Sequence, residues 1–377
     1  MYSKPWFCPD PNFRQFVRDR LAANLEPQVE EIERSKQLTD SSVRFCHDLL
    51  VETLPTRVGG GGLSLLQATI LLEELGYVCP AAAPYLEAGQ LFAKALLLLG
   101  EEDQVSRYLG RMCNGELGAF AMTDWGTGLA PREMSTVLDR SSGALRLHGT
   151  KSKITFIDKA SFFVCFAKDP ECRNRISAVL VNQPATELSI REHSPWEGLR
   201  GHTAWDLEFS GTTVAERLGP PGMGLAAASQ VLAQTRVTLA GGFLGLARRA
   251  LDEALRTIQE RCRTIVPLHV HQGVSFPIVD THALITTAQA ATYSAAVALE
   301  QDCTTPELSA AVKLVASQAL LQAVERLATT LGGAACSTSN PSGRIIRDAF
   351  TWIPAQGTEN AQRLVLVKRL WRDLNIQ

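Results

Sequence analysis

The sequence has no excess of charge of either sign and no long apolar run. Lys and Arg number 37 against 39 Asp and Glu, so the chain lacks the basic field that drives binding to nucleic acid. Its most apolar short stretch, 91–99, is interrupted by Lys94 and is about half the ~20 residues that a membrane-spanning helix requires. We therefore expect neither nucleic acid nor a membrane as a partner.

Paired cysteines are also absent. The nine cysteines are dispersed, odd in number and form no CxxC pair. This pattern indicates neither a disulfide framework nor a zinc site, so we expect no bound metal. The first 14 residues contain Asp10 and two prolines where a signal peptide would need an unbroken apolar run. A cytoplasmic protein is the expectation.

What the chain does contain is typical of a folded protein with more than one core. Hydrophobic residues make up 45% and charged residues 20% of the 377 residues. These values are those of soluble globular proteins rather than disordered ones. The length allows two or three domains at 100–200 residues each.

The first part of the chain has the apolar spacing of helices. Leu65, Leu66, Ile70, Leu71 and Leu75 recur at helical intervals. We assign residues 1–117 to an N-terminal α-helical domain.

Period-two alternation replaces the helical spacing after about residue 116. Trp205, Leu207 and Phe209 alternate with acidic residues, as expected of a half-buried strand. A cluster of glycine and proline at 219–224 marks the end of this region. We assign 118–222 to a middle β-domain of barrel-like form.

Helical spacing returns beyond the glycine and proline cluster. Leu244, Ala247, Leu251, Leu255 and Ile258 share one helical face. Further helical segments are expected at 281–300, 307–331 and 360–374, so 223–377 is assigned to a C-terminal helical bundle of the four-helix type. The fold class is therefore α+β and multidomain.

This order of domains and a series of short motifs together resemble the acyl-CoA dehydrogenase family over nearly the whole chain. The motifs are Gly60-Gly61-Gly62-Leu63, Glu73-Glu74-Leu75-Gly76, Lys313, Leu331-Gly332-Gly333, Arg344, Arg347-Asp348-Ala349 and Gly357-Thr358. The resemblance implies a flavoprotein that oxidises acyl thioesters carried on coenzyme A (CoA). In the branch associated with polyketide biosynthesis, the acyl group is held by an acyl carrier protein.

The resemblance also implies FAD and the residues that hold it. In the family, two strands edge the flavin ring, and their threonines and backbone groups bond its polar rim. The matching residues here are Met122 and Thr123 on one strand, and Ile154 and Thr155 on the other.

Further cofactor contacts are implied in the bundle. Arg261 stands eleven residues before Gln272, the spacing of a family arginine that reaches the FAD pyrophosphate of a neighbouring subunit. A guanidinium suits this role because it gives paired charge-assisted hydrogen bonds to phosphate. Gly332 and Gly333 allow close backbone approach to the cofactor, and Thr358 offers it a hydroxyl. A homodimer or homotetramer is therefore expected.

The usual catalytic glutamate of the family is missing. Most members have it immediately before the Gly-Thr pair, where this chain has Gln356, and an amide cannot accept the substrate's α-proton. Some relatives place it before the arginine of the first bundle helix, where this chain has Thr235. Glu359 is the nearest carboxylate in sequence, although an acid in a first helical turn is also ordinary dipole chemistry. Gln356, Thr235 and Glu359 are the candidate catalytic positions.

Three functions remain open from the sequence. The first is an acyl-thioester dehydrogenase with a relocated base or an unusual position of oxidation, and with an electron-transfer flavoprotein or oxygen as acceptor. The second is a flavin monooxygenase, because oxygenating relatives of this fold also lack the glutamate. The third is a non-catalytic partner. We favour the first, on the analogy of fold.

Overall fold

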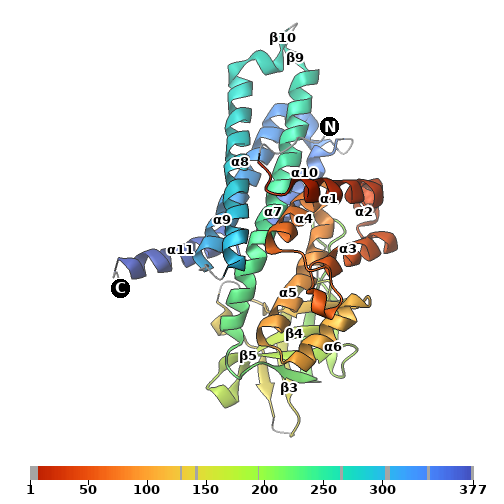
Figure 1. The fold of residues 1–377 in the computed structure, drawn as a ribbon, viewed down its shortest axis with the longest axis vertical. Helices are drawn as coiled ribbons and strands as arrows, with labels where there is room; N and C mark the ends of the chain where they lie inside the picture. The colour runs from red at the N-terminus through yellow and green to blue at the C-terminus, as the bar shows by residue number, and fades with distance from the viewer. Residues whose placement is uncertain are drawn as a thin grey trace.

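The computed structural model describes residues 7–127, 130–140, 143–193, 195–263, 266–301, 306–337 and 340–374. It has a helical part, a sheet and a long helical bundle in chain order (Figure 1). The predicted α+β architecture is confirmed. No helix of the described residues has the length and apolar character needed to cross a membrane.

Six α-helices precede the first strand. They are α1 (Pro11–Asn24), α2 (Val29–Ser35), α3 (Asp40–Glu52), α4 (Leu65–Val78), α5 (Ala83–Leu99) and α6 (Glu102–Cys113). Ser64 starts α4 with a capping box, in which its side chain and that of Gln67 bond each other's backbone N–H. α5 is the helix of this part that contributes to the candidate active site.

The middle of the chain forms one eight-stranded sheet. Its strands are β1 (Leu117–Ala121), β2 (Val137–Asp139), β3 (Arg146–Thr155), β4 (Ala160–Asp169), β5 (Arg175–Asn182), β6 (Leu188–Glu192), β7 (Ala204–Thr213) and β8 (Glu216–Leu218). The order is β6-β7-β3-β2-β4-β5-β8, with β1 parallel to β4.

Strand β4 packs the sheet against the N-terminal helices through one of its two faces. Successive side chains of a strand point to opposite faces. Phe162, with its neighbours at 164 and 166, faces the helical core, whereas Phe163 faces a second core within the sheet domain. The ring of Phe162 lies 4.9 Å from that of Phe92 on α5. Both faces of the strand are therefore buried.

The bundle is built on one long helix. It consists of α7 (Gly224–Glu260), α8 (Gln272–Glu300), α9 (Pro306–Leu331), α10 (Ser342–Trp352) and α11 (Glu359–Asp373), with a small hairpin of β9 (Cys262–Arg263) and β10 (Val266–Pro267) after α7. At 1.5 Å per residue the 37 residues of α7 span about 55 Å. Figure 1 shows α7 running from the sheet to the hairpin at the opposite end.

Glycines let α4 and α7 approach each other closely. A Cβ atom at Gly245 would lie 1.8 Å from the carbonyl oxygen of Glu73, and one at Gly76 would lie 2.2 Å from that of Gly242. No larger residue fits at either position without separating the two helices.

A buried charge cluster ties α1, α4, α7 and α8 together. Glu73 and Glu74 on α4 are enclosed and pair with Arg14 and Arg248. Tyr293 of α8 donates a hydrogen bond to Glu73. Because every member has an opposite charge or a hydrogen bond, the cluster is tolerated inside the core.

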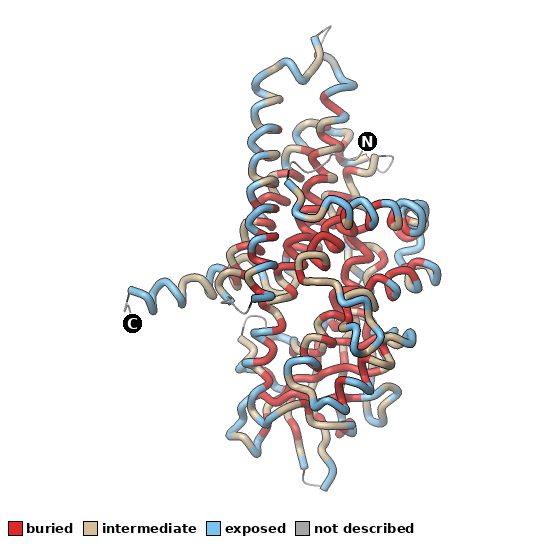
Figure 2. Tube along the Cα trace, viewed as in Figure 1, coloured by how far each residue is buried: buried red, intermediate tan, exposed pale blue. Residues whose placement is uncertain are grey.

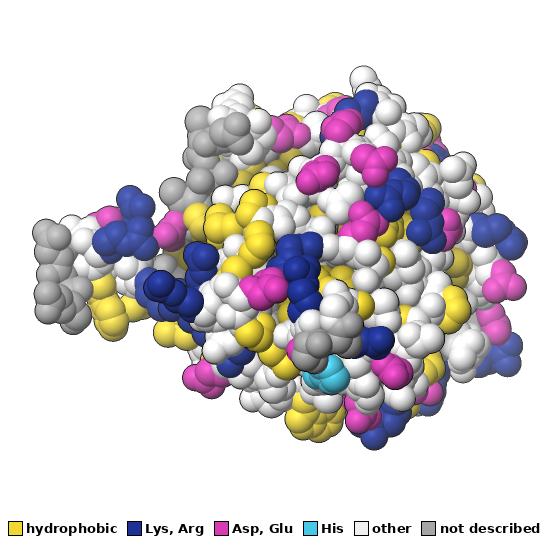
Figure 3. All heavy atoms as spheres, turned by 90° about the horizontal axis from the view of Figure 1, so that it is seen from below, with side chains coloured by type: hydrophobic (Ala, Val, Ile, Leu, Met, Phe, Trp, Pro, Cys, Tyr) yellow, Lys and Arg dark blue, Asp and Glu magenta, His cyan; other side chains and the backbone are white. Residues whose placement is uncertain are grey.

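α11 is little covered by the rest of the described residues. Only Gln362 is buried among the residues of α11, and Figure 2 shows this helix extending from the body with mostly exposed and half-buried residues. Acidic and basic side chains are interspersed on the face seen from below in Figure 3, in keeping with their near-equal numbers.

Candidate active site

The two positions that the resemblance associates with a catalytic base lie side by side. Thr235, buried on α7, donates a hydrogen bond from Oγ1 to Oε1 of Gln356, 2.9 Å away. Gln356 stands in the turn between α10 and α11. Nε2 of Gln356 is buried and makes no hydrogen bond within 3.5 Å to the described residues, although its side chain lies close enough to Glu87 to lower the pKa of that carboxyl.

The backbone of this turn is held in an uncommon conformation. Gln356 has a φ of 54° and Gly357 a φ of 99°, the left-handed region that residues other than glycine rarely adopt. Nε of Arg236 donates to the carbonyl of Gln356 over 3.2 Å, and Lys313 donates to that of Gly357. A strained backbone that several surrounding contacts hold in place is common at functional sites.

Glu87 on α5 is a carboxyl that the sequence reasoning missed. Nε1 of Trp352 donates to its Oε1 over 3.1 Å. Burial raises the pKa of Glu87 to about 7, although Trp352, Lys313 and Gln356 oppose the rise. At neutral pH this group is therefore divided between carboxylate and carboxylic acid, as a general base should be.

Lys313 shares the same enclosed space. Burial lowers its pKa to about 7, and the charge of Arg236 lowers it further, against the opposing effects of Glu359 and Glu87. Its ammonium donates to the carbonyls of Ile353, 3.1 Å away, and of Gly357. Lys313 thus fixes the turn that presents Gln356.

Glu359, the nearest acid in sequence, is engaged elsewhere. It is the first residue of α11 and accepts a hydrogen bond from Ser317 Oγ over 2.9 Å. It also lies 3.7 Å from Arg363 one turn along the helix. Thr358 caps the same helix by accepting from the N–H of Ala361.

The residues predicted to edge the flavin lie where β1 ends and along β3. The carbonyl of Thr123 accepts from the N–H of Ser152 over 2.8 Å, which brings the two segments together. Buried Lys151 donates to the carbonyl of Met122 over 3.0 Å and pairs with Asp124 at 2.5 Å. The side chain of Thr123 is exposed.

Thr155 lies next to buried polar atoms that lack partners. Its Oγ1 is 3.3 Å from Nε2 of His202, whose ring stacks on that of Trp196. Nδ1 of His202 and Nε1 of Trp196 have no hydrogen-bond partner among the described residues. Ile154, the other residue of this pair, is buried beside Thr155. Unpaired polar atoms around a threonine fit the polar rim of a flavin, so these residues suit that end of FAD.

A second group of predicted cofactor contacts lies at the other end of α7. Arg261 caps α7, and its Nη1 donates to the carbonyl of Leu331 over 3.0 Å. Gly332 and Gly333 follow directly, and a Cβ added to either would meet no atom within 4 Å. Gln272 is exposed at the start of α8. This exposed cationic end suits a phosphate group.

The two groups are too far apart to meet within one chain. The 26 residues from Thr235 to Arg261 correspond to about 39 Å along α7. Arg261 therefore cannot reach a cofactor that lies beside Thr235 of the same chain.

A spacing in α5 could have revealed the missed residues. Glu87, Gln90 and Lys94 recur at intervals of three and four in a mostly apolar helix, so they share one helical face. Polar groups on one face of a buried helix indicate a site rather than a solvated surface.

Comparison with known proteins identifies one family along nearly the whole chain. Profiles of the acyl-CoA dehydrogenase N-terminal, middle and C-terminal domains match residues 11–116, 119–212 and 222–371. The chain is 29% identical to the short-chain specific acyl-CoA dehydrogenase of Mus musculus, over 95% of this chain and 89% of that protein. It is 26% identical to an acyl-CoA dehydrogenase of Bacillus subtilis, over 95% and 96%.

Solved structures share the fold. Butyryl-CoA dehydrogenase from Megasphaera elsdenii superposes with a TM-score of 0.89 at 24% identity, covering 98% of this chain and all of the other. The prolyl acyl carrier protein oxidase AnaB superposes with a TM-score of 0.89 at 23% identity, covering 97% and 99%. The chain therefore belongs to the acyl-CoA dehydrogenase family of FAD-dependent oxidoreductases.

Proposed function

We propose that the protein oxidises an acyl thioester with FAD at the site that Thr235 and Gln356 form. The observation that carries this proposal is the 2.9 Å hydrogen bond between these two side chains. It supports a shared reaction centre, because the two residues occupy the alternative base positions implied by the family resemblance. The reacting carbon would lie beside this pair.

Gln356 then has a different task from the glutamate it replaces. An amide cannot accept a proton, but Gln356 has two N–H groups, so one can donate to an oxygen of the substrate while the other approaches Glu87. Arg236 and Lys313 hold the turn, so this donor is fixed in position before the substrate arrives. We infer that Gln356 orients the acyl group.

We assign the proton transfer to Glu87. Its pKa near 7 lets the carboxylate take a proton from the α-carbon, and the electron pair released forms the new double bond as the β-hydride leaves. Bound FAD supplies the acceptor for that hydride. Glu359 is less suited, because Ser317 and Arg363 already engage its carboxylate.

The cofactor is proposed to lie between two copies of the chain. Thr123, Thr155 and Thr358 would contact the flavin end, while Arg261, Gln272 and the Gly332-Gly333 pair of the other copy would contact the pyrophosphate. The distance of about 39 Å along α7 supports this division. A two-fold dimer, or a tetramer of two dimers, completes each site.

CoA and an acyl carrier protein are both proposed carriers of the acyl group. Relatives named for acyl-CoA substrates support the first, and the fold shared with an acyl carrier protein oxidase is compatible with the second. The amide at position 356 also suits a flavin monooxygenase, which needs an oxygen-reactive flavin rather than a base for the α-proton.

Anaerobic flavin reduction separates these functions. The purified protein is mixed with acyl thioesters of CoA and of acyl carrier protein, and flavin absorbance is followed by stopped flow. Bleaching by a thioester alone supports the dehydrogenase. Oxygen uptake that requires an external flavin reductant would instead identify a monooxygenase, and a protein that binds no FAD would be a non-catalytic partner.

A further inference from the structure

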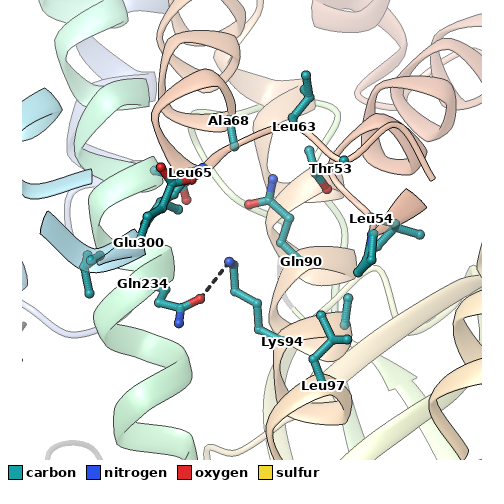
Figure 4. A pocket seen from close by; sticks show the side chains of 15 residues that line it. Thr53, Leu54, Leu63, Leu65, Ala68, Gln90, Lys94, Leu97, Gln234 and Glu300 are labelled. Carbon is teal, nitrogen blue, oxygen red and sulfur yellow. Dashed lines mark hydrogen bonds between the residues drawn. The ribbon is translucent and has the colours of Figure 1, made fainter. Parts of the chain in front are cut away.

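A cavity of about 400 Å³ lies between α4, α5, α7 and α8 (Figure 4). It borders the proposed site, because Gln234 lines it and the next residue, Thr235, contacts Gln356. Lys94 lies two helical turns beyond Glu87 on α5. A short acyl group bound at Thr235 and Gln356 would thus extend towards this space.

Gln90 projects a free amide into the cavity (Figure 4). The residue is only 3% exposed, and neither atom of its amide has a hydrogen-bond partner among the described residues. A buried amide without partners is costly, so its presence points to a ligand that satisfies it.

Lys94 carries a positive charge into the same space. Its Nζ donates to Oε1 of Gln234 over 2.9 Å, and it forms no ion pair with any carboxylate of the described residues. Burial lowers the pKa of Lys94 to about 8, and Glu300 opposes this effect only in part. The ammonium therefore lacks a close counter-charge.

Glu300 is occupied by another partner. Its Oε1 accepts a hydrogen bond from the N–H of Leu65, the first residue of α4. The positive end of a helix dipole stabilises a carboxylate at this point. One oxygen of Glu300 is therefore directed at the start of α4, and Lys94 is the only cation among the described residues that line the cavity.

We propose that this cavity binds a carboxylate at the far end of the acyl group, so that the substrate is the thioester of a short dicarboxylic acid. Lys94 and the amide N–H of Gln90 would both donate to that carboxylate. The inference rests on the proposed function, since it assigns the acyl group of the same reaction.

A simple fatty acyl group fits these observations less well. An apolar end would leave the Gln90 amide unpaired and Lys94 without a counter-charge, whereas a carboxylate satisfies both with charge-assisted hydrogen bonds. A cationic end would be repelled by Lys94.

The test compares two four-carbon thioesters that differ at the far end. Succinyl-CoA carries a carboxylate where butyryl-CoA carries a methyl group. With the FAD-loaded protein we expect succinyl-CoA to have at least a ten-fold lower Kd, measured from the perturbation of flavin absorbance. Lys94→Met should raise the Kd for succinyl-CoA roughly 10- to 100-fold and leave that for butyryl-CoA nearly unchanged.

Two further variants make the result decisive. Gln90→Leu should weaken succinyl-CoA binding in the same direction, and it removes only an unpaired amide, so folding should be retained. Lys159→Met removes an exposed lysine that does not line the cavity and should change neither affinity.

The carboxylate site and the proposed oxidation can be contradicted separately, because thioester binding and flavin reduction are measured separately. Equal affinity for the two thioesters, unchanged by Lys94→Met, would overturn the carboxylate site even if both reduce the flavin. Selective binding of succinyl-CoA, with no reduction of the flavin by any thioester, would instead contradict the proposed oxidation and still support the carboxylate site.

Discussion

Thr235 Oγ1 donates a hydrogen bond to Gln356 Oε1 over 2.9 Å, although 121 positions separate the two residues in the chain. Thr235 belongs to the first helix of the bundle and Gln356 to the turn before the last one. Neither side chain can take a proton from carbon at neutral pH. The chemistry of this centre therefore depends on groups that surround the pair.

Restoring a carboxylate at position 356 should speed ordinary dehydrogenation. We expect Gln356→Glu to raise the rate of flavin reduction by a saturated acyl-CoA, since a positioned general base contributes roughly 10²–10⁴-fold. Stopped-flow absorbance measures the rate. Gln356→Met is the matched control, because it keeps the length without a carboxylate. Equal rates in all three proteins would show that residue 356 does not face the reacting carbon.

Glu87 should control both the rate and its pH dependence. Because burial raises the pKa of Glu87 to about 7, the carboxylate form predominates above pH 7, and the rate of flavin reduction should fall as the pH drops through 7. Glu87→Gln keeps an oxygen for Trp352 and should lower the rate roughly 10²–10⁴-fold.

Glu359→Gln is the control for Glu87. We expect it to retain most of the wild-type rate, because Ser317 and Arg363 engage the carboxylate of Glu359. Loss of activity in Glu359→Gln with activity kept in Glu87→Gln would reverse the assignment and make Glu359 the base.

Arg261 should be needed for tight FAD binding. Loss of a charge-assisted contact to phosphate costs about 1.5–3 kcal/mol, so Arg261→Ala should raise the Kd for FAD roughly 10- to 100-fold. Equilibrium dialysis of the apoprotein measures this constant. Arg256→Ala, at an exposed position on the same helix, should leave it unchanged. Wild-type affinity in Arg261→Ala would argue against the pyrophosphate role.

Assembly and FAD binding should be lost together. Phe276 and Val279 are 57% and 60% exposed in the first turns of α8, the helix that follows the hairpin after α7. We expect light scattering to show a dimer or tetramer, and Phe276→Asp to shift it towards monomer and to weaken FAD binding. Phe16→Asp, equally exposed on α1, is the control. A wild-type monomer saturated with FAD would contradict the shared cofactor site.

The buried charge cluster should dominate acid stability. Burial opposes ionisation of Glu73, but Arg14 and Arg248 outweigh it and lower its pKa to about 2. The stabilisation is therefore fully present above the ordinary value near 4.5 and is lost as the pH falls from there towards 2. Denaturant unfolding across this range should show a decline in the free energy of unfolding.

Arg248→Met tests the same cluster at neutral pH. It leaves Glu73 and Glu74 without one of their shared positive partners, which should cost about 3–5 kcal/mol in the free energy of unfolding. Arg249→Met, its more exposed neighbour, should cost less than about 1 kcal/mol. Similar losses in both variants would mean that the cluster contributes no more than a surface pair.

The sequence by itself determined the architecture and the family. Apolar spacing is a local property, so helices, strands and helices could be assigned in order, and the structure confirms them. The motifs at 73–76 and 313–358 extended this to the acyl-CoA dehydrogenase family and to FAD, which the family profiles bear out. The absence of a glutamate at position 356 could also be read directly.

Only the tertiary structure decided which side chains meet. The sequence places Glu87 on one face of α5 with Gln90 and Lys94, but only the fold brings Trp352, 265 positions later, into hydrogen-bond contact with it. Its raised pKa comes from burial by segments distant in the chain, and such burial has no local signature. The fold also places Lys94 in one cavity with Gln90 and Gln234. Packing, rather than sequence neighbours, sets the surroundings of this charge.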